Sequence, residues 1–424
     1  MKAIGIIAEY NPFHNGHAYQ IEKNKQETGA DYVVIAMSGN FVQRGAPALL
    51  DKYSRAQMAL SCGADLVLEL PVLFAVSSAE HFAKGGVSLL HHTGVVTHLG
   101  FGMEHHYLPT LQNVADVLLR QPEAYQAELR KQLKNGLSYP HARSRALEAY
   151  FIFQKPGFRK ESPQQHLQEI LASPNNILAI EYLKALSYYK SAMIPCPVLR
   201  QGNGYHNTAL NHDFCSASAI RAFLKERRSA CPLEPLANTM PKAAYTLLGR
   251  YPHPYLFEDD FSTLIHYKLL TDPVQRIASY ADSSLPLANR IKKMAPYFVS
   301  WSGFCQLLKT KNVTYTRLSR LLLHMLLQIC QEDFCALSKP SYLRVLGFRK
   351  SAAPLLSAIK KQGSLPLLTN LSKDSKRLPA TAQKLLSYDL DASNLYHLIQ
   401  HSKEAPCARS LPIKNEYQQP ILCL

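Results

Sequence analysis

The sequence predicts an α/β protein in which a doubly wound parallel sheet is followed by a mostly α-helical C-terminal region. Short runs that are apolar throughout recur in the first 100 residues, helical segments separate them, and the strand signal fades beyond about Pro241. Strands that are apolar throughout are typical of parallel sheets covered by helices on both faces. Right-handed crossovers between such strands then give a doubly wound sheet.

The expected elements alternate along the chain. The strands are expected at residues 3–8, 32–37, 65–70, 95–101 and 197–201. The helices are expected at residues 17–28, 52–61, 77–91, 108–150, 177–188 and 215–225. Ligands of such sheets lie beyond the carboxyl ends of the strands. This rule selects the loops after Ala8, Met37, Leu70 and Phe101.

The change of pattern divides the chain into two expected domains. Residues 1–240 hold the sheet, and residues 241–424 form a helical, basic region. The chain shows no internal repeat and no long linker, so we expect the two parts to pack closely.

Composition excludes several classes of protein. A hydrophobic share of 47% and a charged share of 18% are those of a globular protein. No run of about 18 apolar residues is present, and the short N-terminal apolar run lacks a signal-peptide cleavage site. We therefore expect a cytoplasmic protein without a membrane span. The nine cysteines are scattered without a C-x-x-C pair, so neither disulfides nor a metal site is predicted.

The net charge of +16 is unevenly distributed. From Phe304 to Leu424 there are 17 Lys and Arg against 7 Asp and Glu, an excess of 10. An acidic polymer is the natural partner of such a region. Nucleic acid is favoured over a lipid surface, because no basic amphipathic anchor stands out. A basic protein without such a partner is the alternative.

The loop after the first strand carries the strongest chemical signal, Asn-Pro-Phe-His-Asn-Gly-His over residues 11–17. Backbone N–H groups and the dipole at a helix N-terminus attract phosphate. Gly16 permits close approach of a ligand, and His14 and His17 are spaced to face one phosphate. Imidazole donors stabilise the charge that develops on the α-phosphate and pyrophosphate during adenylyl transfer. The pattern predicts an ATP-using adenylyl-transfer enzyme; a turn whose histidines only cap the helix is the alternative.

Further motifs extend this signal along the chain. They stand at residues 9–17, 37–45, 65–71, 100–102, 174–178 and 216–221, and more weakly at residues 315–320 and 342–348. Together they resemble the bacterial tRNA(Met) cytidine acetate ligases over nearly the whole chain. Because that family is related in fold to nucleotidyltransferases and class I aminoacyl-tRNA synthetases, the resemblance implies a nucleotidyltransferase-like, Rossmann-like N-terminal domain.

The resemblance also implies a two-step reaction. Acetate attacks ATP to give acetyl-adenylate and pyrophosphate, and the acetyl group then passes to N4 of the wobble cytidine of elongator tRNA(Met). Residues 1–240 would be the ATP-binding catalytic domain and residues 241–424 the tRNA-binding region. Mg²⁺ is expected to arrive with ATP, without a dedicated protein cage. The sequence does not indicate the oligomeric state.

The resemblance implies ATP contacts in the first loop, at the end of the fourth strand, and around the last strand and the helix after it. In the family's pattern Asn175 and Asn176 compete for one contact, and Asn176 is slightly favoured. Ser216, Ser218 and Arg221 would neutralise the leaving pyrophosphate, or they form an ordinary helix start. The implied ATP-binding residues are Ile7, Ala8, Glu9, Tyr10, Asn11, Pro12, Phe13, His14, Asn15, Gly16, His17, Ala18, Tyr19, Gln20, Gly102, Asn176, Arg200, Gln201, Ser216, Ser218 and Arg221.

The loop at residues 38–45 has a separate expected role. Arg44 is a candidate catalytic residue beside His14 and His17, because a guanidinium can hold a carboxylate such as acetate bidentately. A contact of Arg44 to phosphate is the competing interpretation. The lining of the acetate pocket is not predicted.

Basic side chains in the helical region suit contacts to tRNA phosphates, which fix orientation without reading sequence. Arg317 and Arg320 are expected on one helix face. The candidates are Lys309, Lys311, Arg317, Arg320, Arg344, Arg349 and Lys350.

Two other functions fit part of the sequence. An adenylyltransferase that makes a soluble cofactor would explain the histidine motif but not the basic region. A catalytically silent RNA-binding protein with a nucleotide-binding fold would explain the basic region but not both histidines in a complete loop.

Overall fold

The computed structural model describes residues 1–104, 107–137, 139–154, 170–171, 173–200, 215–226, 233–404 and 415–424. Its strands are β1 (Ala3–Ala8), β2 (Tyr32–Ser38), β3 (Phe41–Val42), β4 (Ala46–Pro47), β5 (Leu66–Leu70), β6 (Val96–Met103), β7 (Ile194–Leu199), β8 (Leu343–Phe348), β9 (Leu367–Leu368) and β10 (Leu422–Cys423).

The helices of the first part are α1 (Asn15–Thr28), α2 (Lys52–Ser61), α3 (Val72–Ala75), α4 (Ala79–His91), α5 (Leu108–Arg120), α6 (Glu123–Lys134), α7 (Tyr139–Gln154), α9 (Pro174–Tyr188) and α10 (Ala217–Glu226). Those that follow are α11 (Lys242–Gly249), α12 (Ser262–Thr271), α13 (Val274–Ser279), α14 (Leu285–Met294), α15 (Trp301–Leu308), α16 (Tyr315–Leu327), α17 (Gln331–Ala336), α18 (Ala353–Gln362), α19 (Leu371–Asp374) and α20 (Ala380–Ser402).

The predicted parallel sheet is confirmed. Strands β5, β2, β1, β6 and β7 lie side by side in that order, and all neighbouring pairs are parallel. In chain order this is the arrangement 3-2-1-4-5, so the direction of winding reverses between β1 and β6. Doubly wound sheets bind their ligands at this switch point, beyond the carboxyl ends of the strands.

Side chains of the strands point alternately to the two faces of the sheet and pack into a hydrophobic core on each face. Ile4, Ile6 and Val33 pack on the side covered by α1, α2, α10 and α11. Ala3 and Val34 face the opposite side, where α3, α4, α9 and α20 contribute the apolar partners. Burial on both faces is the reason that these strands are apolar throughout.

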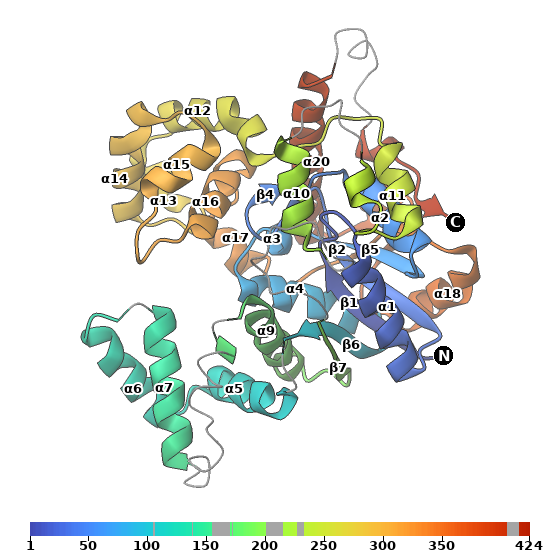
Figure 1. Cartoon of the computed structure of the whole chain (residues 1–424), viewed down its shortest axis with the longest axis horizontal. Helices are drawn as coiled ribbons and strands as arrows, with labels where there is room; N and C mark the ends of the chain where they lie inside the picture. Colours follow the sequence, from blue (N-terminus) through green and yellow to red (C-terminus); the bar gives the residue numbers. More distant parts are fainter. Residues whose placement is uncertain are drawn as a thin grey trace.

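Beyond α11 the chain first forms a helical cluster and then returns to the sheet. Helices α12 to α16 gather beside the sheet, at the upper left of Figure 1. β8 then pairs antiparallel with β5, and β9 and β10 pair with β8. The expectation of little strand structure beyond Pro241 was therefore wrong for β8. A six-residue apolar run is ambiguous between helix and strand, and its partner β5 lies far away in the sequence.

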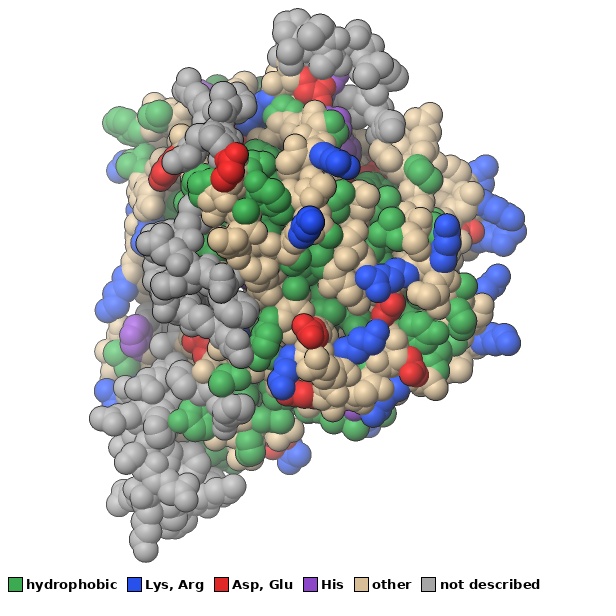
Figure 2. All heavy atoms as spheres, turned by 45° about the vertical axis from the view of Figure 1, so that its right-hand side comes forward, with side chains coloured by type: hydrophobic (Ala, Val, Ile, Leu, Met, Phe, Trp, Pro, Cys, Tyr) green, Lys and Arg blue, Asp and Glu red, His purple; other side chains and the backbone are tan. Residues whose placement is uncertain are grey.

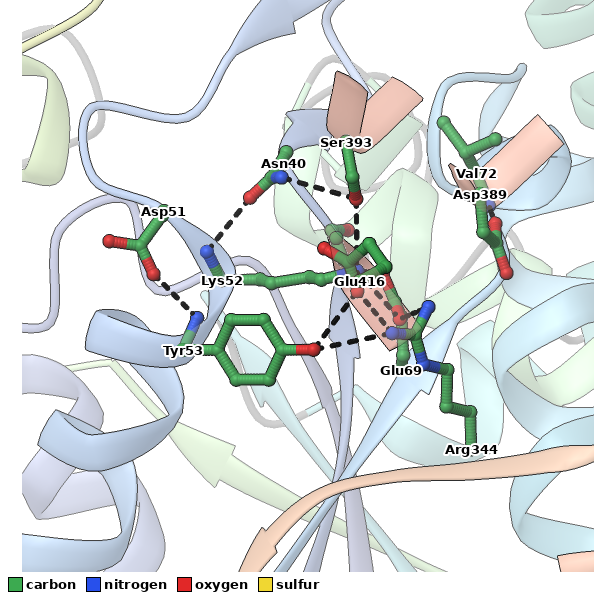
Figure 3. A network of polar contacts seen from close by, with 12 residues as sticks. Asn40, Asp51, Lys52, Tyr53, Glu69, Val72, Arg344, Asp389, Ser393 and Glu416 are labelled. Carbon is green, nitrogen blue, oxygen red and sulfur yellow. Dashed lines mark hydrogen bonds and ion pairs between the residues drawn. The ribbon is translucent and has the colours of Figure 1, made fainter. Parts of the chain in front are cut away.

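A buried polar network anchors the returning segment (Figure 3). Lys52 on α2 pairs with Glu69 on β5 at 2.8 Å and with Glu416 near the C-terminus at 3.1 Å. Arg344 on β8 contacts the same two carboxylates, and its Nη1 lies 2.9 Å from Glu69. Burial alone would raise the pKa of the Glu416 carboxyl, but Lys52 and Arg344 hold this pKa well below its usual range. The network therefore ties the C-terminal strands to the edge of the parallel sheet.

Candidate functional site

A cavity of about 700 Å³ lies at the carboxyl end of the sheet, where the switch point predicts a ligand. Its size falls in the range of about 300–1,000 Å³ that is common for small-molecule sites. The structure brings most of the predicted residues to this cavity, although they are far apart in sequence. The predicted ATP-binding and catalytic residues that line it are Ile7, Ala8, Glu9, Tyr10, Asn11, His14, Gly16, His17, Tyr19, Gln20, Arg44, Gly102, Arg200, Ser216, Ser218 and Arg221.

Other predicted residues do not belong to the cavity wall. Pro12, Phe13, Asn15 and Ala18 lie within the first loop and helix but do not line the cavity, and the side chain of Phe13 is fully buried. Gln201 lies outside the described residues.

His14 and His17 form the centre of the first loop. His14 is the N-cap of α1, and its Nδ1 accepts the backbone N–H of Gly16 at 3.1 Å. The Nδ1 of His17 accepts the backbone N–H of His14 at 3.2 Å. Because Nδ1 is the acceptor in both rings, the proton of each neutral imidazole lies on Nε2. Nε2–H is therefore the donor that each ring can offer to a ligand in the cavity.

Both imidazoles are neutral near pH 7. Burial, followed by the charges of Arg200 and Arg221, lowers the pKa of His14 to about 3. Burial, then His14 and Arg200, lowers the pKa of His17 well below its usual range. A bound phosphate would oppose these shifts, because a nearby negative charge favours the imidazolium form.

Two backbone N–H groups at the start of α1 have partners inside the protein. The N–H of Asn15 donates to the carbonyl of Thr239 at 3.0 Å, and the N–H of Gly16 donates to His14. A Cβ at Gly16 would lie 2.9 Å from Cε1 of His14. Gly16 therefore makes room for the capping histidine ring, and the N–H groups of Asn15 and Gly16 are both bonded within the protein.

Asn175 and Arg200 form one side of the cavity. Nη1 of Arg200 donates to Oδ1 of Asn175 at 2.9 Å, and Gly102 lies beside the Arg200 side chain. Asn176 is buried, and its Oδ1 accepts the N–H of Glu104 at 3.2 Å. Asn175 therefore lines the cavity and Asn176 does not, because the first turn of α9 points the two side chains in different directions.

The start of α10 also lines the cavity, with Ser216 and Ser218. Arg221 donates from Nη1 to the carbonyl of Asn11 at 2.6 Å and from Nη2 to Oγ of Ser218 at 3.1 Å. The positive end of a helix dipole, two hydroxyls and a guanidinium suit a phosphate chain. Arg221 also links the first loop to this helix.

A second end of the cavity lies beside the hairpin formed by β3 and β4. The backbone N–H of Gln43 donates to Oε1 of Glu9 at 2.9 Å. The side-chain amide of Gln43 donates to the carbonyl of Ser77 at 3.1 Å. Arg44 lies on the same hairpin. Apolar side chains accompany these polar groups, including Ala79, Phe82 and Tyr182. The helical region closes this end through α16, with Tyr315, Thr316, Ser319 and Arg320.

Arg55 on α2 is a site-supporting residue that the sequence analysis missed. Its side chain is fully buried and donates to the carbonyls of Glu9 at 2.5 Å and Ser38 at 3.1 Å, and also to Gly39. It thereby joins the loops after β1 and β2. The sequence signal that could have identified Arg55 is an arginine among the apolar positions of a buried helix, because a buried charge needs polar partners.

The proposed tRNA-binding residues occupy different environments. Lys309, Lys311 and Lys350 are exposed, whereas Arg349 is half-buried and donates to the carbonyl of Leu60 at 2.8 Å. Arg344 is 4% exposed and pairs with Glu69 and Glu416. The assignment of Arg344 to tRNA is therefore corrected, because its charge is neutralised inside the protein.

Arg317 and Arg320 share one face of α16, as expected, but this face meets a turn at Asp282. Arg317 donates to the carbonyl of Asp282 at 2.9 Å. Arg320 is largely buried and binds the Asp282 carboxylate with two nitrogens, at 2.7 and 3.1 Å. Arg320 therefore lines the cavity as a paired residue and does not present a free surface charge.

The face shown in Figure 2 carries Lys and Arg side chains that stand apart, with acidic and hydrophobic side chains between them. Among the described residues, no group of three or more His, Cys, Asp or Glu could hold a metal ion. None of the described helices is long and apolar enough to cross a membrane.

Comparison with known proteins identifies the family. A family model described as HIGH Nucleotidyl Transferase matches residues 1–409. A tRNA(Met) cytidine acetate ligase of Acetivibrio thermocellus is 40% identical over 405 residues, which are 93% of this chain and 94% of the relative. One of Clostridium kluyveri is 39% identical over 404 residues, 94% of this chain and 95% of the relative. This chain belongs to the tRNA(Met) cytidine acetate ligase family of HIGH nucleotidyl transferases.

Solved structures of this acetate ligase family share the whole fold. The apo structure of Thermotoga maritima TmcAL is 31% identical, covers 100% of both chains and superimposes with a TM-score of 0.91. The same protein bound with alpha-thio ATP covers 100% of this chain and 99% of its own, with a TM-score of 0.88. The predicted resemblance and the predicted fold class are thereby confirmed.

Proposed function

We propose that this protein is an ATP-dependent acetate ligase that acetylates N4 of the wobble cytidine of elongator tRNA(Met) through acetyl-adenylate. The observation that carries the proposal is the pair of Nε2–H donors of His14 and His17 in a cavity at the switch point of the sheet. The names of the relatives, and the ATP analogue bound to the Thermotoga protein, support ATP and tRNA(Met) as substrates.

The two ends of the cavity suggest how ATP is held. The nucleoside would lie beside Gly102, Asn175 and Arg200, since Gly102 has no side chain to obstruct it. The phosphates would run past both histidines toward the start of α10. Mg²⁺ would enter with the phosphates, because that ion is commonly held by phosphate oxygens and water with few protein ligands.

Acetate would occupy the other end, beside Arg44 and the apolar side chains of Ala79 and Phe82. Its carboxylate oxygen attacks the α-phosphorus, and pyrophosphate leaves toward Ser216, Ser218 and Arg221. The imidazole donors stabilise the charge on the α-phosphate oxygens more strongly in the transition state than in bound ATP. In the second step the N4 amine of cytidine attacks the acetyl carbonyl, and AMP leaves.

The RNA would approach from the side of α16, where Tyr315 and Thr316 line the cavity and the exposed Lys309 and Lys311 precede them. Exposed lysines next to the site can bind backbone phosphates and bring the wobble base to the adenylate. Residues 241–424 would supply most of this RNA-binding surface.

A pyrophosphate-release assay tests the proposal. Pyrophosphate release from ATP should require acetate but not RNA, and labelled acetyl should reach RNA only when tRNA(Met) is added. Release that depends on another small acceptor would instead indicate a cofactor adenylyltransferase. RNA binding without any ATP turnover would indicate a catalytically silent protein.

A further inference from the structure

The hairpin that carries Arg44 makes backbone contact with α16. Gly45 has a φ of 73°, and a Cβ at this position would lie 2.3 Å from the backbone nitrogen of Arg320 and 2.5 Å from its Cα. Such distances exclude any side chain at residue 45 unless the hairpin moves away from the helix. The close approach brings the loop after β2 directly onto the helical region.

Ser319 completes this contact through two hydrogen bonds. Its hydroxyl donates to the carbonyl of Gly45 at 2.8 Å and accepts the indole N–H of Trp301 at 3.0 Å. Trp301 is fully buried on α15 and is the only tryptophan of the chain. A continuous chain of hydrogen bonds therefore runs from Trp301 through Ser319 to the residue next to Arg44.

The hairpin is held from two sides. On the sheet side, Gln43 bonds to Glu9 and to the carbonyl of Ser77. On the helical side, α16 is itself fixed to the helical cluster by the two-point contact of Arg320 with Asp282. In the part of the chain that the structure describes, the Ser319 hydroxyl bonds Gly45 and Trp301, and neither residue belongs to the histidine loop after β1.

We propose that Ser319 is a positioning residue that sets the place of Arg44 at the carboxylate end of the cavity. This inference rests on the proposed function, in which acetate is the second small substrate. Loss of the hydroxyl would free the Gly45 carbonyl from α16 and displace the neighbouring Arg44, while the nucleotide end keeps its geometry. Ser319 would therefore affect the binding of the carboxylate separately from the binding of ATP.

Steady-state kinetics of Ser319→Ala tests the proposal. The KM for acetate should rise about fivefold to tenfold, the effect expected for one buried hydrogen bond, while the KM for ATP stays as in the wild type. Ser319→Thr keeps the hydroxyl and should restore the acetate KM to within about twofold of the wild type. An unchanged acetate KM, or an equal rise in the ATP KM, would overturn the positioning role.

Ser262→Ala provides a matched control. Oγ of Ser262 accepts the backbone N–H of Trp301 at 3.0 Å, so this variant also removes a hydroxyl that bonds Trp301. The bond between Ser262 and Trp301 does not involve the hairpin. The Ser262→Ala variant should therefore keep the wild-type KM for acetate. A rise as large as that of Ser319→Ala would show that general loosening around Trp301 is the cause.

Fluorescence of Trp301 gives a second measurement that does not depend on activity. Ser319→Ala removes the acceptor of the indole N–H, so its emission maximum should shift from that of the wild type, whereas Ser319→Thr should not shift. Identical emission from Ser319→Ala and the wild type would refute the hydrogen-bond chain. If the wild type releases no pyrophosphate with acetate, the proposed function fails, but the fluorescence comparison still decides whether Ser319 couples the hairpin to α15.

Discussion

Lys52 and Glu416 form a buried ion pair, with Nζ and Oε2 3.1 Å apart, between α2 and the last segment of the chain. Lys52 → Met would leave Glu69 and Glu416 buried together with Arg344 as their remaining cation. We expect the variant to lower the free energy of unfolding by about 3–5 kcal/mol, the cost of breaking a buried pair. Urea unfolding measures this change.

Lys23→Met is the control for that prediction. Lys23 pairs with Glu27 on the exposed face of α1 at 3.5 Å. Its loss should change the free energy of unfolding by less than about 0.5 kcal/mol, because exposed pairs are screened by water. Equal losses in the two variants would contradict the anchoring role of the buried network.

His17→Asn separates the capping role of the histidine from its donor role. The asparagine amide oxygen can replace Nδ1 as acceptor of the His14 N–H, but no group replaces Nε2–H. We expect a folded protein whose turnover in pyrophosphate release falls about 100-fold to 1,000-fold, as for loss of one transition-state donor. Circular dichroism checks the fold, and turnover close to that of the wild type would exclude the phosphate role of His17.

The depressed histidine pKa values predict lower stability in acid. The pKa of His14 is near 6.5 in the unfolded chain and about 3 in the folded protein. Between these values the unfolded state binds more protons, so stability is complete above about pH 6.5 and decreases as the pH falls. The limiting slope is about 1.4 kcal/mol per pH unit for each histidine.

Urea unfolding of the ligand-free protein from about pH 7 to about pH 5 measures this slope. A His14→Asn and His17→Asn double variant should show a flatter dependence, since asparagine does not titrate. The same slope in the double variant would mean that other groups cause the acid sensitivity.

Asn175→Ala and Asn176→Ala should have different effects. Asn175 lies on the cavity wall with Arg200, so its loss should raise the KM for ATP about tenfold. Asn176 is buried against the N–H of Glu104, so its loss should cost about 1–3 kcal/mol of stability with little change in the KM for ATP. The reverse outcome would restore Asn176 as the ligand contact.

A Lys309→Ala and Lys311→Ala double variant should weaken tRNA binding without affecting adenylate formation. Two lost phosphate contacts would reduce the slope of log affinity against log salt by about 2. Lys360→Ala with Lys361→Ala removes the same charge from the exposed end of α18 and serves as the control. Equal loss of affinity in both double variants would indicate a general charge effect and not a defined RNA-binding surface.

Most of the parallel sheet and the central motif could be predicted from the sequence. The strand at Ala3–Ala8 and the helix at Lys52–Ser61 have the expected bounds, because apolar runs and helical periodicity are local signals. His14 and His17 line the cavity for the same reason, since a strand end, a loop and a helix start place them there.

What the sequence could not predict concerns side chains whose environment depends on distant partners. From the sequence, Arg344 was expected to be an exposed basic residue. In the structure it is buried and paired with two carboxylates that are remote in the chain. Asn175 and Asn176 are consecutive residues of one helix, so their side chains point in different directions around its axis. The sequence does not show which of these directions faces the sheet and which faces the cavity.

The sequence by itself determined the fold class, the position of the histidine loop and the family, because each is encoded in short segments whose periodicity and spacing are read locally. Only the tertiary structure decided which basic residues carry a free charge, which asparagine faces the cavity, and how the hairpin of Arg44 is held. The hydrogen bond of Ser319 to Gly45 joins residues 274 positions apart. Such contacts arise when the cores pack together, and no local pattern in the chain specifies them.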